Sequence, residues 1–363
     1  MPYLERIEVL KTRLEAIGSP ARLDLAFIPS RAPTQAFSEF LTNKEQGDWA
    51  EQTFVINFNC SNESLWATKY GRSEDLIAGE PGFDEYYASY QDELATIGKR
   101  PDLLIFDRAF LAAQACGLAA DISTLPPDEL AVLVPQAKAA IEVRSSAFLS
   151  RKYEAATHEE SRRLHAAISQ ACHRLLDEFA EVLVQFSPSW LDFCRRTIAD
   201  NIGPAPRALA RRSTAPLQAA SALTGEIKQH LKQLEKRAFL SITPKAEDMS
   251  LVYRWLQRFE VPHYYCQVFF DRAVLMGFED ILRLIAQPER ENVDYFIESD
   301  EKNQGKTTFK INIALGNEAM HDIRIPEHQS AMKELPKGRL LFYVRFSPSA
   351  AQFHPLEIAD ATH

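Results

Sequence analysis

Two short apolar segments that carry acidic residues constrain the fold of this chain more than any other feature. The first is Gly98-Lys-Arg-Pro-Asp-Leu-Leu-Ile-Phe106. Its continuous apolar run, Leu103 to Phe106, is typical of a strand that is buried on both faces of a sheet. Pro101 stands just ahead of this run, where a missing N–H costs little, and Asp102 opens the predicted strand.

The second segment is Ala139-Ala-Ile-Glu-Val-Arg-Ser-Ser-Ala147, which we also interpret as a strand. Glu142 and Arg144 share one face of it because side chains alternate along a strand. If the two strands are neighbours in the sheet, Asp102 and Glu142 converge at their ends. Two carboxylates with no obvious cationic partner repel each other unless a divalent cation lies between them. The two segments therefore predict a metal site.

This arrangement resembles the PD-(D/E)XK nuclease superfamily, in which Pro-Asp begins one strand and an acid-x-lysine tripeptide lies on the next. Pro101-Asp102 matches this pattern, and Glu142-Val143-Arg144 matches it with arginine in place of the usual lysine. Residues 97–106 and 141–148 are most similar to the AccI-type group of type II restriction endonucleases. Val261-Pro-His-Tyr-Tyr-Cys-Gln-Val-Phe-Phe-Asp271 is similar to a late core strand of those enzymes. The resemblance covers roughly residues 45 to 280, with a gap in the middle.

The resemblance implies an α/β fold: a PD-(D/E)XK restriction-endonuclease-like mixed sheet flanked by helices, with a helical insertion and a β-rich C-terminal part. It also implies Mg²⁺-dependent, site-specific hydrolysis of double-stranded DNA by a homodimer. In this reading Asp102 and Glu142 hold Mg²⁺, with the Val143 carbonyl as a possible further ligand. Arg144 supplies charge near the phosphate, but it stays protonated and so is not the base.

Two further residues are candidates for this site. Lys245, at the start of a predicted helix, could reach the site as a displaced catalytic lysine; the alternative is a surface lysine. A helix is also predicted to begin near Asp48, which is a good N-cap residue. Glu51 lies in the first turns of that helix and is a candidate for an additional acid near the metal. The alternative is an ordinary solvated helix residue.

Residues 150–237 are helical in composition and become basic towards their end. Positions 195–237 hold nine Lys or Arg residues against three Asp or Glu residues, in a chain with a formal net charge of −9. Local basic charge of this kind is what phosphate binding requires, although a charge run is usually a solvated face. The candidates for contact with DNA are Arg195, Arg196, Arg207, Arg211, Arg212 and Lys228.

The pattern of elements predicts four regions. They are residues 1–150 with N-terminal helices and the first part of the core, 151–237 as the basic insertion, 238–288 as the rest of the core, and 289–363 as a β-rich part that extends the sheet or forms a dimer contact. Helices are expected at 3–17, 83–97 and 244–258, strands at 264–270, 295–297, 307–314 and 339–346, a hairpin turn at 300–305, and irregular structure at 60–82.

Other patterns narrow the class of protein. No apolar run approaches the length that spans a bilayer, and the N-terminus lacks the apolar core of a signal peptide. Five widely spread cysteines without a CxxC pair predict reduced thiols in the cytoplasm. The nine histidines show no metal-ligand spacing. His158 and His165, and likewise His321 and His328, are seven positions apart and are expected to be surface residues. A repair or structure-specific nuclease, a catalytically weakened DNA-binding module, and an α/β protein unrelated to nucleic acids remain as alternatives.

Overall fold

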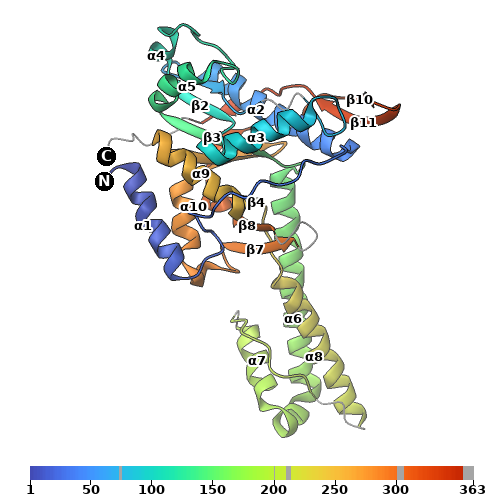
Figure 1. Ribbon diagram of the computed structural model, residues 1–363. Coiled ribbons are helices and arrows are strands. Elements are labelled where there is room, and N and C mark those ends of the chain that lie inside the picture. The colour runs from blue at the N-terminus through green and yellow to red at the C-terminus, as the bar shows by residue number, and fades with distance from the viewer. Residues whose placement is uncertain (73–75, 200, 210–213, 301–305, 355–363) are drawn as a thin grey trace. The chain divides into compact units, whose positions relative to one another are not determined.

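The computed structural model describes residues 1–72, 76–199, 201–209, 214–300 and 306–354. The chain forms two compact units (Figure 1). Met1–Ser150 and Leu240–His363 make up the first unit, and Arg151–Phe239 make up the second. Arg211, Arg212 and residues 301–305 of the turn predicted at 300–305 lie outside the described residues.

The first unit is built on a mixed sheet, which has seven strands in the part of the chain that the structure describes. From one edge to the other the strands are β1 (Leu65–Lys69), β2 (Leu103–Asp107), β3 (Ala139–Ser145), β5 (His263–Val268), β6 (Arg272–Gly277), β9 (Asn317–His321) and β12 (Gln352–Phe353). β3 and β5 run parallel, and every other neighbouring pair is antiparallel. The two acid-bearing strands β2 and β3 are neighbours, which meets the condition for Asp102 and Glu142 to converge.

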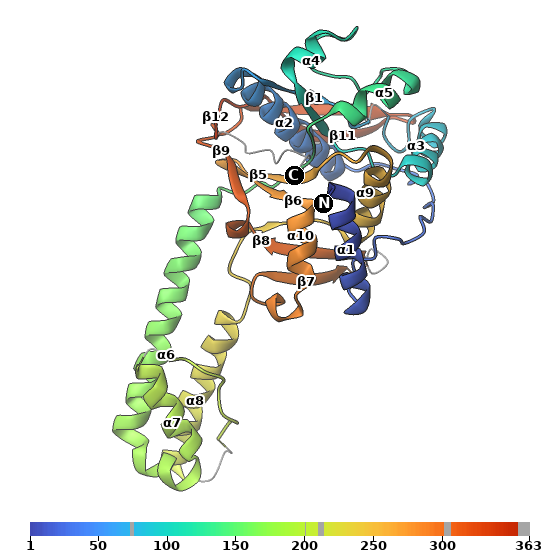
Figure 2. The same cartoon turned by 90° about the vertical axis from the view of Figure 1, so that its left-hand side faces the viewer.

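Helices cover both faces of this sheet (Figures 1 and 2). α2 (Ser38–Ser61) packs Trp49 and Phe54 into a core that includes Val143 of β3. α1 (Tyr3–Ala16), α9 (Ala246–Phe259) and α10 (Phe278–Ile285) lie on the other side. Because side chains alternate along β3, Val143 points towards α2, whereas Glu142 and Arg144 point to the opposite face.

Smaller elements complete the first unit. They are α3 (Phe83–Ile97), α4 (Arg108–Ala112), α5 (Pro127–Leu133), the small sheet of β4 (Ser241–Ile242), β8 (Lys306–Asn312) and β7 (Tyr295–Asp300), the hairpin of β10 (His328–Leu335) and β11 (Arg339–Phe346), and 3-10 turns at Val134–Gln136, Pro288–Arg290 and Ile313–Leu315. β9 and β12 extend the large sheet at the edge opposite β1.

The second unit consists of helices with a core of their own. They are α6 (Ser150–Phe186), whose first residue belongs to the first unit, α7 (Pro188–Ile198) and α8 (Ala215–Leu234). Trp190, Phe193 and Ile227 are fully buried between them. Pro188 starts α7 because a proline is tolerated in the first helical turn but not inside a helix. No helix in the described ranges of either unit is long and apolar enough to cross a membrane.

Several predicted elements are confirmed and two are wrong. The helices at 3–17, 83–97 and 244–258 are α1, α3 and α9, and the strand at 264–270 is β5. The helix predicted to begin at Asp48 begins at Ser38 instead, because Leu41 packs into a separate buried cluster and holds the polar first turns in place. The stretch 60–82 is not wholly irregular, because β1 pairs with β2 there.

Candidate active site

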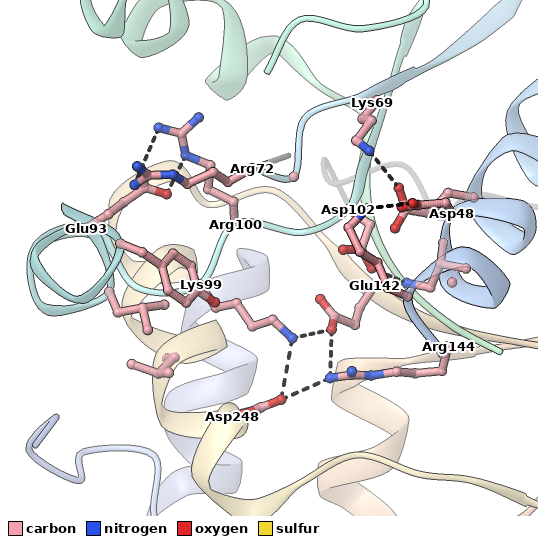
Figure 3. Close-up of a pocket in the computed structure, with 18 of the residues that line it drawn as sticks. Asp48, Lys69, Arg72, Glu93, Lys99, Arg100, Asp102, Glu142, Arg144 and Asp248 are labelled. Atoms are coloured by element: carbon pink, nitrogen blue, oxygen red, sulfur yellow. Dashed lines mark hydrogen bonds and ion pairs between the residues drawn. The ribbon is translucent and has the colours of Figure 1, made fainter. Parts of the chain in front are cut away.

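The sequence-predicted acids lie together in a cleft of the first unit with a volume of about 450 Å³ (Figure 3). Side chains from α2, α3, α9 and the ends of β1, β2 and β3 line it. The lining includes every residue of the first unit that the sequence proposed for catalysis or metal binding, namely Glu51, Asp102, Glu142, Val143, Arg144 and Lys245.

Backbone contacts fix Asp102 at the start of β2. Its carbonyl oxygen accepts hydrogen bonds from the N–H groups of Tyr70 and Gly71, both at 2.9 Å. Its carboxylate oxygen Oδ2 accepts a hydrogen bond from the Val143 N–H at 2.7 Å. A Cβ atom on Gly71 would lie only 3.0 Å from the Asp102 Cα, so this close approach favours glycine. Asp102 is thus held between the loop after β1 and strand β3.

Glu142 belongs to a ring of alternating charges (Figure 3). Lys99 Nζ contacts Glu142 Oε1 and lies 3.4 Å from Asp248 Oδ2. Arg144 Nη2 lies 2.8 Å from Glu142 Oε1 and 2.9 Å from Asp248 Oδ2. The expectation that the paired acids lack a cationic partner is therefore wrong for Glu142. Two cations balance Glu142 and Asp248, and the second of these acids comes from α9.

Gly98 lets the chain bring Lys99 to this ring. Its φ angle is +82°, in the left-handed region, and a Cβ atom there would lie 2.2 Å from the Leu251 carbonyl oxygen. The Lys99 N–H donates a hydrogen bond to the same oxygen at 3.2 Å. The segment before β2 therefore lies directly against α9, one turn away from Asp248.

The ring controls the ionisation of its acids. Burial alone would raise the pKa of Asp248, but Lys99 and Arg144 outweigh it and lower this pKa to about 2. The pKa of Glu142 is also lowered by these two cations, against the effect of burial. Both carboxylates are therefore charged at neutral pH, even though the Glu142 side chain is only 2% exposed.

The acids outside the ring behave in the opposite way. Burial, together with the negative charges of Glu142 and Glu51, raises the pKa of Asp102 well above its ordinary value. Burial also raises the pKa of Glu51 to about 7, although Lys69 Nζ lies 3.4 Å from its carboxylate and acts against this rise. The part of the cleft around Asp102 and Glu51 therefore holds more carboxyl groups than the nearby cations can keep ionised.

A divalent metal ion fits these residues. Glu142 Oε2 is buried and has no hydrogen-bond partner among the described residues. A buried charged oxygen without a partner is costly, and a cation next to Asp102 would both satisfy it and favour ionisation of the neighbouring acids. Hard carboxylate oxygens are the ligands that Mg²⁺ prefers.

Lys245 and two arginines also line the cleft. Lys245 is the N-cap residue of α9, and burial lowers the pKa of its amino group. Arg72 and Arg100 lie on the wall beside Glu93 of α3 (Figure 3), 3.8 and 2.7 Å from its carboxylate. Arg100 also lies over the ring of Tyr70, with 5.2 Å between its Cζ and the ring centroid. The wall therefore presents two ordered guanidinium groups.

The predicted DNA-contacting residues belong to the second unit. Arg195 and Arg196 are exposed in the last turn of α7 and line a shallow depression with Pro206. Arg207 follows on the exposed segment after α7, and Lys228 is half-buried on α8. The structure therefore brings Arg195 and Arg196 together at one depression.

A family model described as AccI restriction endonuclease matches residues 1–359. The chain belongs to the AccI restriction endonuclease family. It is thus a type II site-specific deoxyribonuclease, a hydrolase of a restriction system that acts on DNA, and the family resemblance drawn from the sequence is confirmed. Restriction endonucleases generally use divalent metal ions, in agreement with the acidic cleft. No curated protein and no solved structure matches the chain.

For this AccI-family enzyme, sequence reasoning missed several residues of the cleft. Lys99 and Arg100 directly precede Pro101-Asp102, so their position beside the motif was a usable signal. Asp248 carried no such signal, because its place in the site depends on how α9 packs against the segment before β2.

Proposed function

We propose that the cleft is the active site for Mg²⁺-dependent hydrolysis of phosphodiester bonds in double-stranded DNA, on a core of the PD-(D/E)XK type. The observation that carries this proposal is the convergence of Asp102 and Glu142 from adjacent antiparallel strands, with a buried oxygen of Glu142 left without a partner. The order in the sequence, Pro-Asp and then acid-x-cation on the next strand, supports the same assignment.

Asp102 and Glu142 would hold the Mg²⁺, with the Val143 carbonyl as a further ligand and Glu51 as an additional acid. Bound there, the metal ion would polarise phosphoryl oxygens and lower the pKa of an attacking water. Without a metal ion, burial holds the pKa of Glu51 at about 7. Mg²⁺ beside it would lower this pKa, so Glu51 would take part as a charged carboxylate.

Lys99 takes the role that the lysine of the tripeptide has in the superfamily pattern. Its Nζ contacts Glu142, and the charges of Glu142 and Asp248 raise its pKa despite burial and the repulsion of Arg144. Lys99 and Arg144 both remain charged, so they offset the negative charge that develops on the phosphate, and neither is the base. The base is then a second water, a phosphate oxygen of the substrate or another side chain. Lys245, whose pKa is lowered, is the lysine in the cleft best suited to lose a proton.

Recognition of DNA involves both units. Arg72 and Arg100 face the cleft and would bind phosphates flanking the cleaved bond, because a guanidinium group grips phosphate oxygens in a bidentate way. In the second unit, Arg195, Arg196, Arg207 and Lys228, together with Arg211 and Arg212 outside the described residues, would contact the DNA backbone. A two-fold homodimer would match a palindromic site.

The five cysteines are free thiols, as suits a cytoplasmic enzyme.

Digestion of plasmid DNA by the purified full chain tests this proposal. We expect discrete fragments with Mg²⁺ and none with EDTA, and no fragments with Asp102→Asn or Glu142→Gln. Asp128→Asn is the matched control, since Asp128 is an exposed acid in the first turn of α5 and should leave cleavage intact. Cleavage that persists in EDTA, or in either active-site variant, would exclude this cleft as the metal-dependent active site.

A further inference from the structure

We infer that Glu318, His321 and His354 form a second metal site, which binds Zn²⁺ or a similar late first-row divalent ion. One ligand atom from each of these residues lies within 4.8 Å of the other two. Glu318 and His321 lie on β9, and His354 directly follows β12. The site is at the edge of the large sheet opposite β1, and it shares no residue with the catalytic cleft.

Strand pairing preorganises the three residues. Gln352 pairs with His321 and Phe353 pairs with Met320, so the end of β12 lies beside the end of β9. The His354 N–H donates a hydrogen bond to the Ala319 carbonyl at 2.9 Å. Phe353 packs edge-on against Phe54 and Phe58 in the core, with ring centroids 5.1 and 5.3 Å away. The backbone on both sides of the cluster is therefore fixed without a metal.

The hydrogen bonds of His321 leave one ring nitrogen ready to bind a metal. Its Nε2 lies 3.0 Å from Gln352 Oε1, and with this oxygen as the acceptor the ring proton is assigned to Nε2. In the neutral ring, Nδ1 then carries a lone pair. This Nδ1 is buried and has no hydrogen-bond partner within the described part of the chain. A histidine whose other N–H is held by an oxygen is the usual form of a metal ligand.

An ion pair orients Glu318, and His354 lies next to it. Glu318 Oε2 lies 3.6 Å from Arg272 Nη1, which leaves Oε1 facing His354 Nε2 at 3.4 Å. The rings of His321 and His354 lie with their centroids 4.3 Å apart. The side chain of His354 is 46% exposed, so an ion can enter from solvent.

The donor set decides the class of ion. Two imidazole nitrogens and one carboxylate oxygen suit Zn²⁺ and its neighbours, whereas Mg²⁺ prefers oxygen ligands alone. Three protein ligands leave a fourth position for water. Spacing along the chain gives no sign of this set, because His321 and His354 are far apart in the sequence and meet only through the pairing of β9 with β12. An ion there would add a link between β9 and the two-residue strand β12, beyond their backbone pairing.

A competition titration tests this site. Bound metal is first removed from the full chain with a chelator. The chain is then titrated with Zn²⁺ against a chromophoric chelator in excess Mg²⁺. We expect one Zn²⁺ ion to bind tightly per chain, without displacement by Mg²⁺. His321→Gln and His354→Gln should each abolish that binding. His328→Gln, an exposed histidine on β10 outside the cluster, should keep it. Gln352→Ala leaves every ligand in place and should weaken Zn²⁺ binding about 10- to 100-fold.

Two further readouts separate the metal site from effects on folding. Zn²⁺ should raise the thermal unfolding temperature of the original chain and of His328→Gln, but not that of His321→Gln. Co²⁺ should give the visible absorption of a nitrogen- and oxygen-ligated site in the original chain, reduced in Gln352→Ala. Equal Zn²⁺ binding by all variants, or none by the original chain, would overturn the inference.

Discussion

Replacement of Lys99 by methionine is the sharpest test of the charge ring in the proposed catalytic cleft. The side chains of Lys99, Glu142 and Asp248 are only 17%, 2% and 22% exposed. Without Lys99, Arg144 alone faces two carboxylates. Removing one partner of a buried ion pair costs about 3–5 kcal/mol. Because Asp248 retains some contact with water, we expect the free energy of unfolding to fall by about 3 kcal/mol.

The double variant Lys99→Met/Asp248→Asn separates charge balance from loss of packing. It leaves Arg144 facing Glu142 alone, one cation for one anion. We therefore expect it to regain at least half of the stability that Lys99→Met loses, in urea unfolding followed by circular dichroism at neutral pH. Arg345→Met is the control, since Arg345 is 54% exposed in its ion pair with Glu45 and should cost less than about 1 kcal/mol.

Single-turnover cleavage of plasmid DNA then tests catalysis in the same variants. If the charge of Lys99 acts on the transition state, cleavage should fall about 10²- to 10³-fold and stay low in the double variant. Recovery of cleavage along with stability would restrict Lys99 to a structural role. A loss of stability below about 1 kcal/mol for Lys99→Met, or a further loss on adding Asp248→Asn, would refute the charge-balance argument.

Three other predictions follow from the cleft. Asp102→Asn should change the free energy of unfolding by less than about 1 kcal/mol, because burial already favours the neutral carboxyl group; calorimetry should nevertheless show that Mg²⁺ binding is lost. Gly98→Ala should lower the free energy of unfolding by at least about 2 kcal/mol, since it forces an alanine into the left-handed region and against α9. Gly47→Ala is the control: Gly47 lies inside α2 with open space around it, so this change should raise the free energy of unfolding by about 0.5–1 kcal/mol. Folding raises the pKa of Glu51 from 4.5 to about 7, so between these pH values the folded state holds a proton that the unfolded state has released. The metal-free protein should therefore lose stability as the pH rises from 4.5 to about 7. Glu51→Gln should flatten this slope of unfolding free energy against pH.

The sequence was sufficient for the parts of the site that depend on neighbours along the chain. Pro101-Asp102 and the apolar run after it define β2, and the alternation along β3 places Glu142 and Arg144 on one face. These local signals are strong because both strands are buried and their side chains have few alternatives. Asp102 and Glu142 could therefore be assigned to one site from the sequence.

The rest of the site depends on packing between distant segments. Lys99 and Asp248 meet across 149 positions because Gly98 lets one segment lie on α9. The first turns of α2 are polar and are held by a separate cluster around Leu41, so no local pattern marks where that helix begins. His321 meets His354 only through a two-residue strand. Local patterns carry no signal for these contacts.

The place of the helical insertion also sets the order in which the enzyme is assembled. Ala140 of β3 pairs with His263 of β5, 123 positions later in the chain. At roughly 5–20 residues per second of synthesis, β5 is made about 6 to 25 seconds after β3. The insertion has its own buried core and can fold during that interval. Asp248, which completes the charge ring, also lies beyond the insertion, so an unfinished chain on the ribosome lacks the assembled site.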